Sequence, residues 1–401
     1  MSGDLASFLN ALPLPGPNTE AFIIPSDADI TTWRQAVRAL LTEDYHLAVT
    51  LSDPLGYDVI QYTDSQQNKT YYVLRERNNA RGLGTYVYNP TACRTLSIHA
   101  PHAGGDLNTR PQSIAMFLEL NAVTLLIAGT HRCSNWQASP CDGTTSICRG
   151  TEAPYPISDV SHYTQNFFQP AHEEIVTKFP GITAISIHGF AWRAGDPDVI
   201  ISNGTSADLS QSLTIRLADQ YNQRFNQLGI PLRAGSCNQA GGPTRLCATT
   251  NVQGRFVNGS TDVCRQGVST VSGPERFVHV EQSCAMRQIS NCTRPASVPY
   301  QVTIEVFAVV FPCSPRLQEA PANPSTPLRP IKLNPTRSCS ENPISAGNER
   351  PATSTISLNS ETRIKRPSPT MTNRCLPSRG LSFSSRAASM VNRLQNAPES
   401  T

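Results

Sequence analysis

Short, largely apolar segments separated by helical patterns constrain the fold of this chain most strongly. Val123–Ala128 and Ile182–Ile187 have the character of strands that are buried on both faces of a parallel sheet. Thr109–Asn121 and about residues 208–228 place apolar side chains at helical spacing instead. Strands that alternate with helices in this way predict an α/β fold, a sandwich around a mostly parallel sheet.

The same two periodicities predict the remaining elements. Two strand-like segments on either side of the polar turn DSQQNK indicate a β-hairpin. Two further segments place their apolar residues on one face of a helix. The predicted strands are Tyr57–Tyr62, Tyr71–Arg75, Leu96–Ile98, Val199–Ile201, Phe277–Gln282 and Gln301–Phe311, and the additional predicted helices lie near residues 30–42 and 170–178.

Composition divides the 401 residues into three segments. Residues 1–50 are expected to be an irregular N-terminal segment with one helix, and residues 51–313 the α/β domain. Residues 314–401 contain one aromatic residue, Phe383, no Asp, and twelve Lys or Arg against five Glu. Such a segment buries too little apolar surface to offset its ordering entropy, so we expect a disordered, basic tail. Its charges are dispersed, which favours a solvated tail over a specific nucleic-acid partner.

Cysteine usage favours disulfide bonds. Ten of the twelve cysteines lie between Cys93 and Cys313, and none forms the Cys-x-x-Cys pair of a structural zinc site. We therefore expect mostly disulfides, including bridges within residues 133–148.

Disulfides persist in oxidising compartments, which favours an extracellular location. Asn-x-Ser/Thr sequons at Asn68, Asn203, Asn258 and Asn291 are compatible with export. The N-terminus, however, lacks the basic and apolar regions of a secretory signal, so a cytoplasmic location stays open. No apolar run is long enough to span a bilayer, and a transmembrane segment is not expected.

Polar residues follow or end three of the predicted strands. His102 and Asp106 follow the strand around Ile98, His188 follows Ile187, and Glu281 lies near the end of its strand. In open α/β sheets, ligands bind at the carboxyl edge of the strands. Two histidines and one acid are the ligand set of a catalytic zinc, which keeps a fourth position for water. A separate glutamate is then needed to move the proton of that water.

Two arginines are candidates for binding an anionic substrate. Arg132 follows the apolar strand at Val123–Ala128 and is suited to a bidentate pair with a carboxylate. Arg287 lies six residues beyond Glu281 and is the second candidate.

The order His, acid, Arg, His-Gly, Glu resembles the zinc carboxypeptidase superfamily, and in particular its amidohydrolase branches. These are the phage poly-γ-glutamate hydrolases and the N-formylglutamate amidohydrolases. Ala184–Gly189 is similar to the strand that brings the second zinc histidine, and Val278–Gln282 is similar to the strand with the catalytic glutamate. The resemblance covers about residues 57–311, although some thirty residues carry it.

The resemblance implies a three-layer α/β/α sandwich with a mixed sheet and a zinc ion bound by His102, Asp106 and His188. It also implies that Glu281 is the general base and then the general acid. The carboxypeptidases space their first two ligands as His-x-x-Glu and the phage enzymes use a longer gap that ends in Glu, whereas this chain has His-x-x-x-Asp. The second ligand is thus the point of departure, and His99 is the alternative to Asp106.

The sequence therefore predicts a zinc-dependent hydrolase of amide bonds, acting on a peptide, a γ-glutamyl polymer or an N-acyl amino acid. The alternative is a non-catalytic, disulfide-stapled binding protein on the same fold. A binding protein has no need to hold His102, Asp106 and His188 around an open position, so the metal site separates the two hypotheses. The sequence leaves the substrate and the oligomeric state open.

Overall fold

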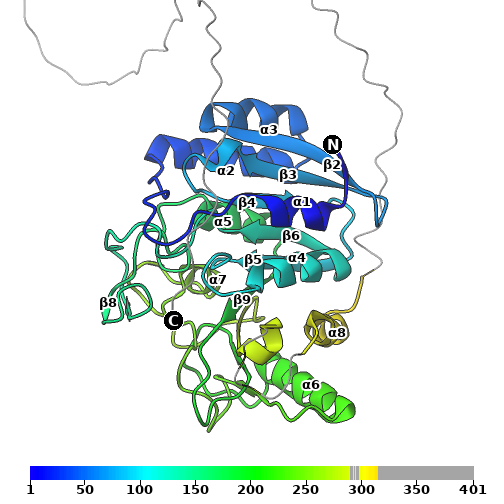
Figure 1. The fold of residues 1–401 in the computed structure, drawn as a ribbon, viewed down its shortest axis with the longest axis vertical. Helices are drawn as coiled ribbons and strands as arrows, with labels where there is room; N and C mark the ends of the chain where they lie inside the picture. The colour runs from blue at the N-terminus through cyan, green and yellow to red at the C-terminus, as the bar shows by residue number, and fades with distance from the viewer. Residues whose placement is uncertain (290–291, 293, 295–297, 315–401) are drawn as a thin grey trace, which may run out of the picture. The chain divides into compact units, whose positions relative to one another are not determined.

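A ten-stranded mixed sheet runs through the part of the chain that the computed structural model describes, which comprises residues 1–289, 292, 294 and 298–314. Its strands are β1 (Ser2–Gly3), β2 (Tyr57–Asp64), β3 (Lys69–Glu76), β4 (Thr85–Tyr88), β5 (Arg94–Ala100), β6 (Ala122–Ile127), β9 (Thr183–Gly189), β10 (Val199–Ser202), β11 (Ala234–Ser236) and β12 (Phe277–Gln282). They lie in the order β1-β2-β3-β4-β6-β5-β9-β12-β10-β11 (Figure 1). A separate two-stranded pair consists of β7 (Thr144–Thr145) and β8 (Ala153–Pro154).

The central strands of this sheet are parallel. β6, β5, β9 and β12 pair in parallel with one another, whereas β2, β3 and β4 join through antiparallel pairs. Every residue of β6 is buried, as are all residues of β9 before Gly189, because helices cover both of their faces. Because β5 and β9 are parallel neighbours, their carboxyl ends meet at one edge of the sheet.

Helices pack on both faces of the sheet and form two apolar clusters. One face carries α1 (Leu5–Ala11), α4 (Thr109–Glu119), α6 (Leu213–Leu228) and α8 (Tyr300–Val310), and the other carries α2 (Asp27–Leu41), α3 (Tyr45–Ser52), α5 (Phe168–Lys178) and α7 (Val252–Val257) (Figure 1). Three short 3₁₀ turns lie at Asp53–Leu55, Arg77–Asn79 and Cys284–Arg287. The predicted α/β fold with a mixed sheet is confirmed. No described helix combines the length and the apolar character that a membrane span requires.

The prediction of a final strand at Gln301–Phe311 is wrong, because this segment is α8. The helix begins directly after Pro299, a residue whose fixed φ is compatible with a helix N-terminus. Val302, Val306 and Phe307 are buried against the cluster that also contains α6. Its polar residues Gln301, Thr303 and Glu305 alternate with apolar residues, which is the period of a strand.

The expectation of one helix in residues 1–50 is also wrong. This segment contains α1 and α2, and α3 spans the boundary that was placed at residue 50. Asp4 caps α1 by accepting hydrogen bonds from the backbone N–H groups of Ala6 and Ser7. β1 extends the sheet by pairing with β2. Whether residues 51–313 form a domain of their own stays a prediction, and the predicted disordered tail lies outside the described residues from residue 315 onward.

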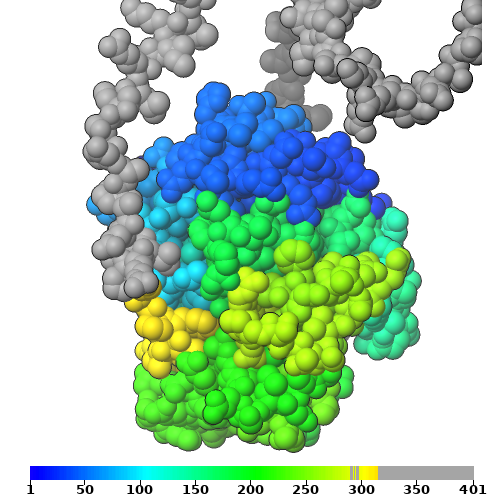
Figure 2. All heavy atoms as spheres, turned by 180° about the vertical axis from the view of Figure 1, so that it is seen from behind, coloured from blue at the N-terminus to red at the C-terminus, as the bar shows by residue number. Residues whose placement is uncertain are grey.

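Five disulfides join the ten cysteines that lie from Cys93 to Cys313. The pairs are Cys93–Cys313, Cys133–Cys148, Cys141–Cys264, Cys237–Cys247 and Cys284–Cys292. The expected bridge within residues 133–148 is present. The third cysteine of that segment, Cys141, bonds to Cys264 in a loop that is distant in the sequence. Figure 2 shows that loop (yellow-green) near the teal segment that contains Cys141. This many disulfides is compatible with an extracellular protein.

Candidate functional site

A tight turn after β5 brings His102 and Asp106 together. The backbone carbonyl of His102 accepts hydrogen bonds from the N–H groups of Gly105 and Asp106, both at 2.9 Å. The turn is closely packed at Gly104, where an added Cβ would lie 2.8 Å from Leu14 Cδ2. The two side chains consequently point into the same buried space, and both residues are at most 3% exposed.

His188 reaches the same space from the neighbouring strand β9, and its ligand atom completes a triangle. His188 Nδ1 lies 3.0 Å from His102 Nδ1 and 3.5 Å from Asp106 Oδ2. His102 Nδ1 lies 3.2 Å from Asp106 Oδ2. Three ligands of a tetrahedral zinc, each about 2.0–2.1 Å from the ion, stand roughly 3.3–3.4 Å apart. The spacing of the three donor atoms therefore fits zinc.

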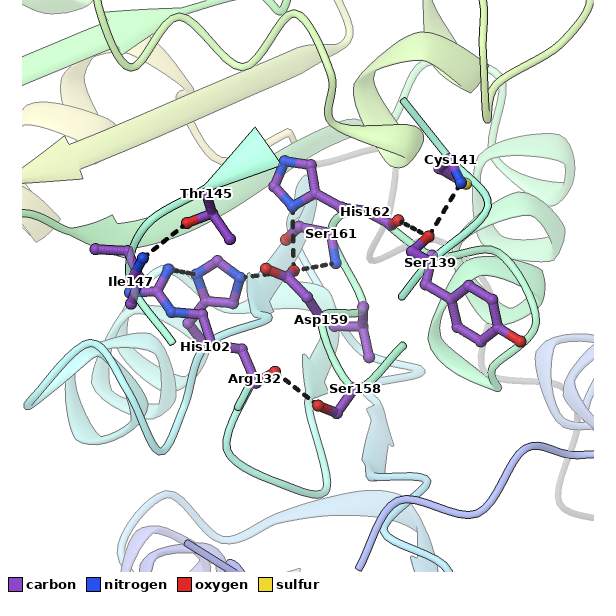
Figure 3. A network of polar contacts seen from close by, with 12 residues as sticks. His102, Arg132, Ser139, Cys141, Thr145, Ile147, Ser158, Asp159, Ser161 and His162 are labelled. Atoms are coloured by element: carbon purple, nitrogen blue, oxygen red, sulfur yellow. Dashed lines mark hydrogen bonds and ion pairs between the residues drawn. The ribbon is translucent and has the colours of Figure 1, made fainter. Parts of the chain in front are cut away.

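Asp159 fixes the orientation of His102 from the other side of the ring (Figure 3). His102 Nε2 lies 3.0 Å from Asp159 Oδ1. Because an ionised carboxylate only accepts hydrogen bonds, Nε2 carries a proton, and Nδ1 is the nitrogen that can offer a lone pair to the triangle when the ring is neutral. A carboxylate behind a metal-binding histidine is the usual arrangement at metal sites.

The same carboxylate oxygen holds a second histidine. His162 Nδ1 lies 3.2 Å from Asp159 Oδ1, and the ring of His162 stacks on that of Tyr155 at a centroid distance of 3.5 Å. Both Asp159 and His162 come from the long cysteine-containing segment between β6 and α5. The sequence assigned no role to Asp159. The length of that segment is a sequence signal for a functional role, because long loops are uncommon in compact domains unless they are functional.

Arg132 contacts both members of the turn. Its Nη2 donates to Asp106 Oδ1 at 2.7 Å, and its Nη1 donates to His102 Nδ1 at 2.9 Å. Burial alone would raise the pKa of Asp106, but the guanidinium of Arg132 and the ring of His102 hold that pKa well below its ordinary value. Asp106 is therefore ionised, and its Oδ2 remains directed at the two histidines, where it also accepts the Gly189 N–H.

A proton and a metal ion compete for His102. Burial and Arg132 lower the pKa of His102, whereas Asp159 and Asp106 raise it, with a net result of about 9. His188 is different, because burial lowers its pKa to about 4 against the effect of Asp106. The second nitrogen of His188 lies 2.9 Å from Ser186 Oγ, which leaves Nδ1 for the triangle.

Glu281 lies beside the triangle on β12, directly opposite His188 in the register of the two parallel strands. It is buried, and its Oε2 has no hydrogen-bond partner within the described part of the chain. Its Oε1 lies 3.7 Å from His279 Nε2. Burial and the nearby Asp106 raise the pKa of Glu281 to about 8. A buried carboxylate without a structural partner is suited to exchange a proton.

The second predicted arginine is held more firmly than expected. The guanidinium of Arg287 donates to the backbone carbonyls of Gln282, Leu107 and Phe190. It also packs against Gly189, where an added Cβ would clash with the Arg287 guanidinium. Its charge still faces the cavity, although three of its N–H groups are committed to the backbone.

These groups line one cavity of about 700 Å³. His102, Arg132, His188, Glu281 and Arg287 lie in its wall, together with His162 and Tyr155. The six predicted site residues are thus brought together, since Asp106 also lines the cavity.

Two further donor groups share histidines with the triangle, namely His102–Asp159–His162 and His188–His279–Glu281. In the first, His102 Nε2 donates to Asp159 Oδ1, so that nitrogen offers no lone pair to a metal. In the second, His188 is the shared member, and its Nδ1 points at His102. The triangle of His102, Asp106 and His188 is therefore the best candidate for a metal.

His99, the alternative second ligand, lies elsewhere. Its Nε2 is 2.9 Å from Ser97 Oγ, and its ring packs edge-on against Phe168 and His172 of α5. It belongs to none of the potential metal-binding groups among the described residues.

No family model matches the chain, and no curated protein matches it. Among solved structures, it is similar to N-formylglutamate amidohydrolase from Ralstonia eutropha JMP134, at 11% identity and a TM-score of 0.32, covering 57% of this chain and 95% of the other. It is also similar to a metallo-carboxypeptidase from Pseudomonas aeruginosa, at 15% identity and a TM-score of 0.29, covering 68% and 67%. These values are too low to transfer an activity, so the function is inferred from the site itself.

Proposed function

We propose that this protein is a zinc-dependent hydrolase of amide bonds. The observation that carries the proposal is the triangle of His102 Nδ1, His188 Nδ1 and Asp106 Oδ2, with separations of 3.0–3.5 Å, beside Glu281, whose Oε2 has no hydrogen-bond partner among the described residues. Two nitrogens and one carboxylate oxygen are the donor set of a catalytic zinc that keeps an open position.

The residues of the cavity would have separate roles in this reaction. Zinc bound at the triangle would supply a Lewis acid for the amide carbonyl and an acidified water. Glu281 would accept a proton from an attacking water in the cavity and return it to the leaving nitrogen, so one carboxylate serves both halves of the reaction. Asp159 keeps the proton of His102 on Nε2, and Arg132 keeps Asp106 ionised.

The charges of the cavity favour an anionic substrate. Arg132 and Arg287 both lie in its wall. Arg132 already pairs with Asp106, so Arg287 is the guanidinium whose charge would attract a substrate carboxylate. A peptide, a γ-glutamyl polymer and an N-acyl amino acid all combine a carboxylate with an amide bond. The cavity volume of about 700 Å³ accommodates a group of that size.

Metal analysis tests the proposal. The full chain, purified without chelator, should contain about one zinc per molecule by plasma mass spectrometry. His102→Ala, His188→Ala and Asp106→Ala should each lose tight zinc binding, because each removes one of three ligands. His99→Ala is the matched control, a buried histidine on the same strand as the turn, and it should retain zinc. Full zinc occupancy in both histidine variants, or greater loss in His99→Ala than in Asp106→Ala, would contradict the assignment.

Glu281→Gln separates an enzyme from a binding protein. This variant should bind zinc like the unaltered chain, because Glu281 is not a member of the triangle. Release of amino groups from a panel of N-acyl amino acids, short peptides and poly-γ-glutamate should fall about 10²–10⁴-fold. A zinc-loaded chain that hydrolyses none of these substrates would favour the non-catalytic alternative.

A further inference from the structure

Three of the four Asn-x-Ser/Thr sequons lie within the described residues, and their asparagine side chains differ in exposure to solvent. Asn203 is 0% exposed and Asn258 is 7% exposed, whereas Asn68 is exposed. Asn291 lies outside the described residues. An N-linked glycan needs both a free side-chain nitrogen and room for a sugar, and these two requirements can be examined at each position.

The amide nitrogens of the two buried sequons are already in use. Asn203 Nδ2 donates to Glu275 Oε1 at 2.5 Å, and Asn258 Nδ2 donates to the backbone carbonyl of Asn203 at 2.8 Å. Asn203 Oδ1 in turn accepts hydrogen bonds from the backbone N–H and the hydroxyl of Thr205. A sugar on either nitrogen would break this buried network and leave polar groups unpaired.

Asn68 has the opposite surroundings. It occupies the tip of the β2–β3 hairpin in a left-handed conformation, with φ of 52°, which asparagine tolerates in turns. Asp64 Oδ1 holds the turn by accepting the N–H groups of Gln66 and Gln67 at 3.1 and 2.7 Å. Within the described part of the chain, the Asn68 side chain makes no hydrogen bond. The turn is thus ordered by other residues, and the amide of Asn68 is free.

The topology places this tip at the edge of the sheet opposite the cavity. β6 is parallel to β5, β4 is antiparallel to β6, and β3 is antiparallel to β4, so β3 runs in the same direction as β5. The turn after β5 carries His102 and Asp106, whereas Asn68 immediately precedes the start of β3. A glycan on Asn68 therefore points away from the candidate site and leaves its entrance clear.

We propose that Asn68 carries an N-linked glycan when the chain passes through a eukaryotic secretory pathway, and that Asn203 and Asn258 do not. In the transfer, Asn68 Nδ2 forms a bond to the anomeric carbon of a lipid-pyrophosphate-linked oligosaccharide. The bond between that carbon and the pyrophosphate oxygen breaks, the lipid pyrophosphate leaves, and the displaced amide proton passes to a base of the transferase. The inference does not depend on the proposed hydrolase activity.

Peptide mapping tests the assignment. The full chain is expressed behind a cleavable leader in cultured mammalian cells, and both the secreted and the cell-retained protein are collected. N-glycans are removed enzymatically in H₂¹⁸O, which converts each glycosylated Asn to a labelled Asp. The peptide with Asn68 should carry the label in most molecules, and the peptides with Asn203 and Asn258 in secreted protein should not.

Two substitutions at the hydroxyl position of the sequon provide the matched controls. Thr70→Ser keeps the sequon and should keep the glycan, whereas Thr70→Ala destroys it and should lose one glycan's mass on a denaturing gel. Asn68→Gln should give the same loss and leave zinc content unchanged, because the tip is remote from the triangle. An unlabelled Asn68 peptide in both protein pools, or label on Asn203 or Asn258 in secreted protein, would overturn the proposal.

Discussion

Asp159 uses one carboxylate oxygen to orient two histidine rings. Its Oδ1 accepts from His102 Nε2 and His162 Nδ1, so the protons of the two rings are fixed in opposite senses. His102 thereby directs Nδ1 at Asp106 and His188, while His162 directs Nε2 elsewhere in the cavity wall. Burial alone would raise the pKa of Asp159, but His102 and His162 hold it well below its ordinary value, which keeps this carboxylate charged.

Asp159→Asn should therefore weaken zinc binding without removing a ligand. We expect an affinity loss of about 10–100-fold, because the amide no longer fixes the His102 proton on Nε2. Competition with a chromogenic chelator measures the dissociation constant. Asp142→Asn is the control, since Asp142 lies in the same segment but accepts from Arg255 instead, and its zinc affinity should stay unchanged. Equal losses in both variants would indicate general disruption of the segment.

Sequence alone placed the three triangle residues and Glu281 because each lies on or just after a recognisable strand. Parallel strands align their carboxyl ends, so residues that are 86 positions apart, such as His102 and His188, were expected to meet. Asp159 follows none of the strands that the sequence predicts, and it belongs to no periodic pattern. Its position depends on the disulfides and hydrogen bonds of its own loop, which no local spacing encodes.

At the scale of elements, the same limit explains α8. QVTIEVFAVVF is rich in β-branched residues, and local propensity favours a strand. The chain forms a helix because this segment packs beside α6 on the apolar cluster, where Arg224 of α6 also pairs with Glu305. Tertiary packing thus overrides a weak local preference. The amphipathic helices near residues 27–41 and 168–178 were predicted well because their polar faces reveal the period.

Burial of a histidine in α5 should make the protein sensitive to acid. His172 is 0% exposed, and burial lowers its pKa to about 3, against an unfolded value of about 6.5. Between these values the unfolded chain binds a proton that the folded chain does not, so stability is lost as the pH falls. From pH 7 to pH 5, we expect His172 to cost about 2 kcal/mol of unfolding free energy.

Urea unfolding at pH 5, 6 and 7 measures this dependence. His172→Gln should reduce it by about the contribution of His172, because an amide does not titrate and can still donate to the Gln253 carbonyl that His172 Nε2 contacts. The exposed His46→Gln is the control and should retain the full dependence on pH. An unchanged slope in His172→Gln would show that other groups govern the acid sensitivity.

The five disulfides predict the number of free thiols in the chain. Because ten cysteines are paired, the denatured, unreduced chain should show at most two free thiols, from Cys339 and Cys375. Titration with a chromogenic disulfide reagent in guanidinium measures them. Ten or more thiols would contradict both the pairing and the extracellular location.

At the scale of the whole molecule, we expect residues after 314 to contribute little to the stability of residues 1–314. The body is anchored up to that point, since Cys313 bonds to Cys93 and the Ser314 N–H donates to the Cys93 carbonyl at 2.8 Å. A chain that ends at Ser314 should therefore keep its zinc and any hydrolase activity. Its melting temperature should stay within about 2 °C of the full chain, which corresponds to less than roughly 1 kcal/mol. A fall of more than about 5 °C would show that the tail stabilises the body.

The Cys93–Cys313 bridge closes a covalent ring that spans residues 93–313 and contains every residue of the triangle and Glu281. A protease that cuts one peptide bond inside this ring opens it without separating the two pieces. The nicked chain migrates as one species until a reductant is added, and its strands remain at high effective concentration for one another. In a protease-rich fluid, a single cleavage would then leave the two halves of the site tied together, and a second cut would be needed to release a fragment.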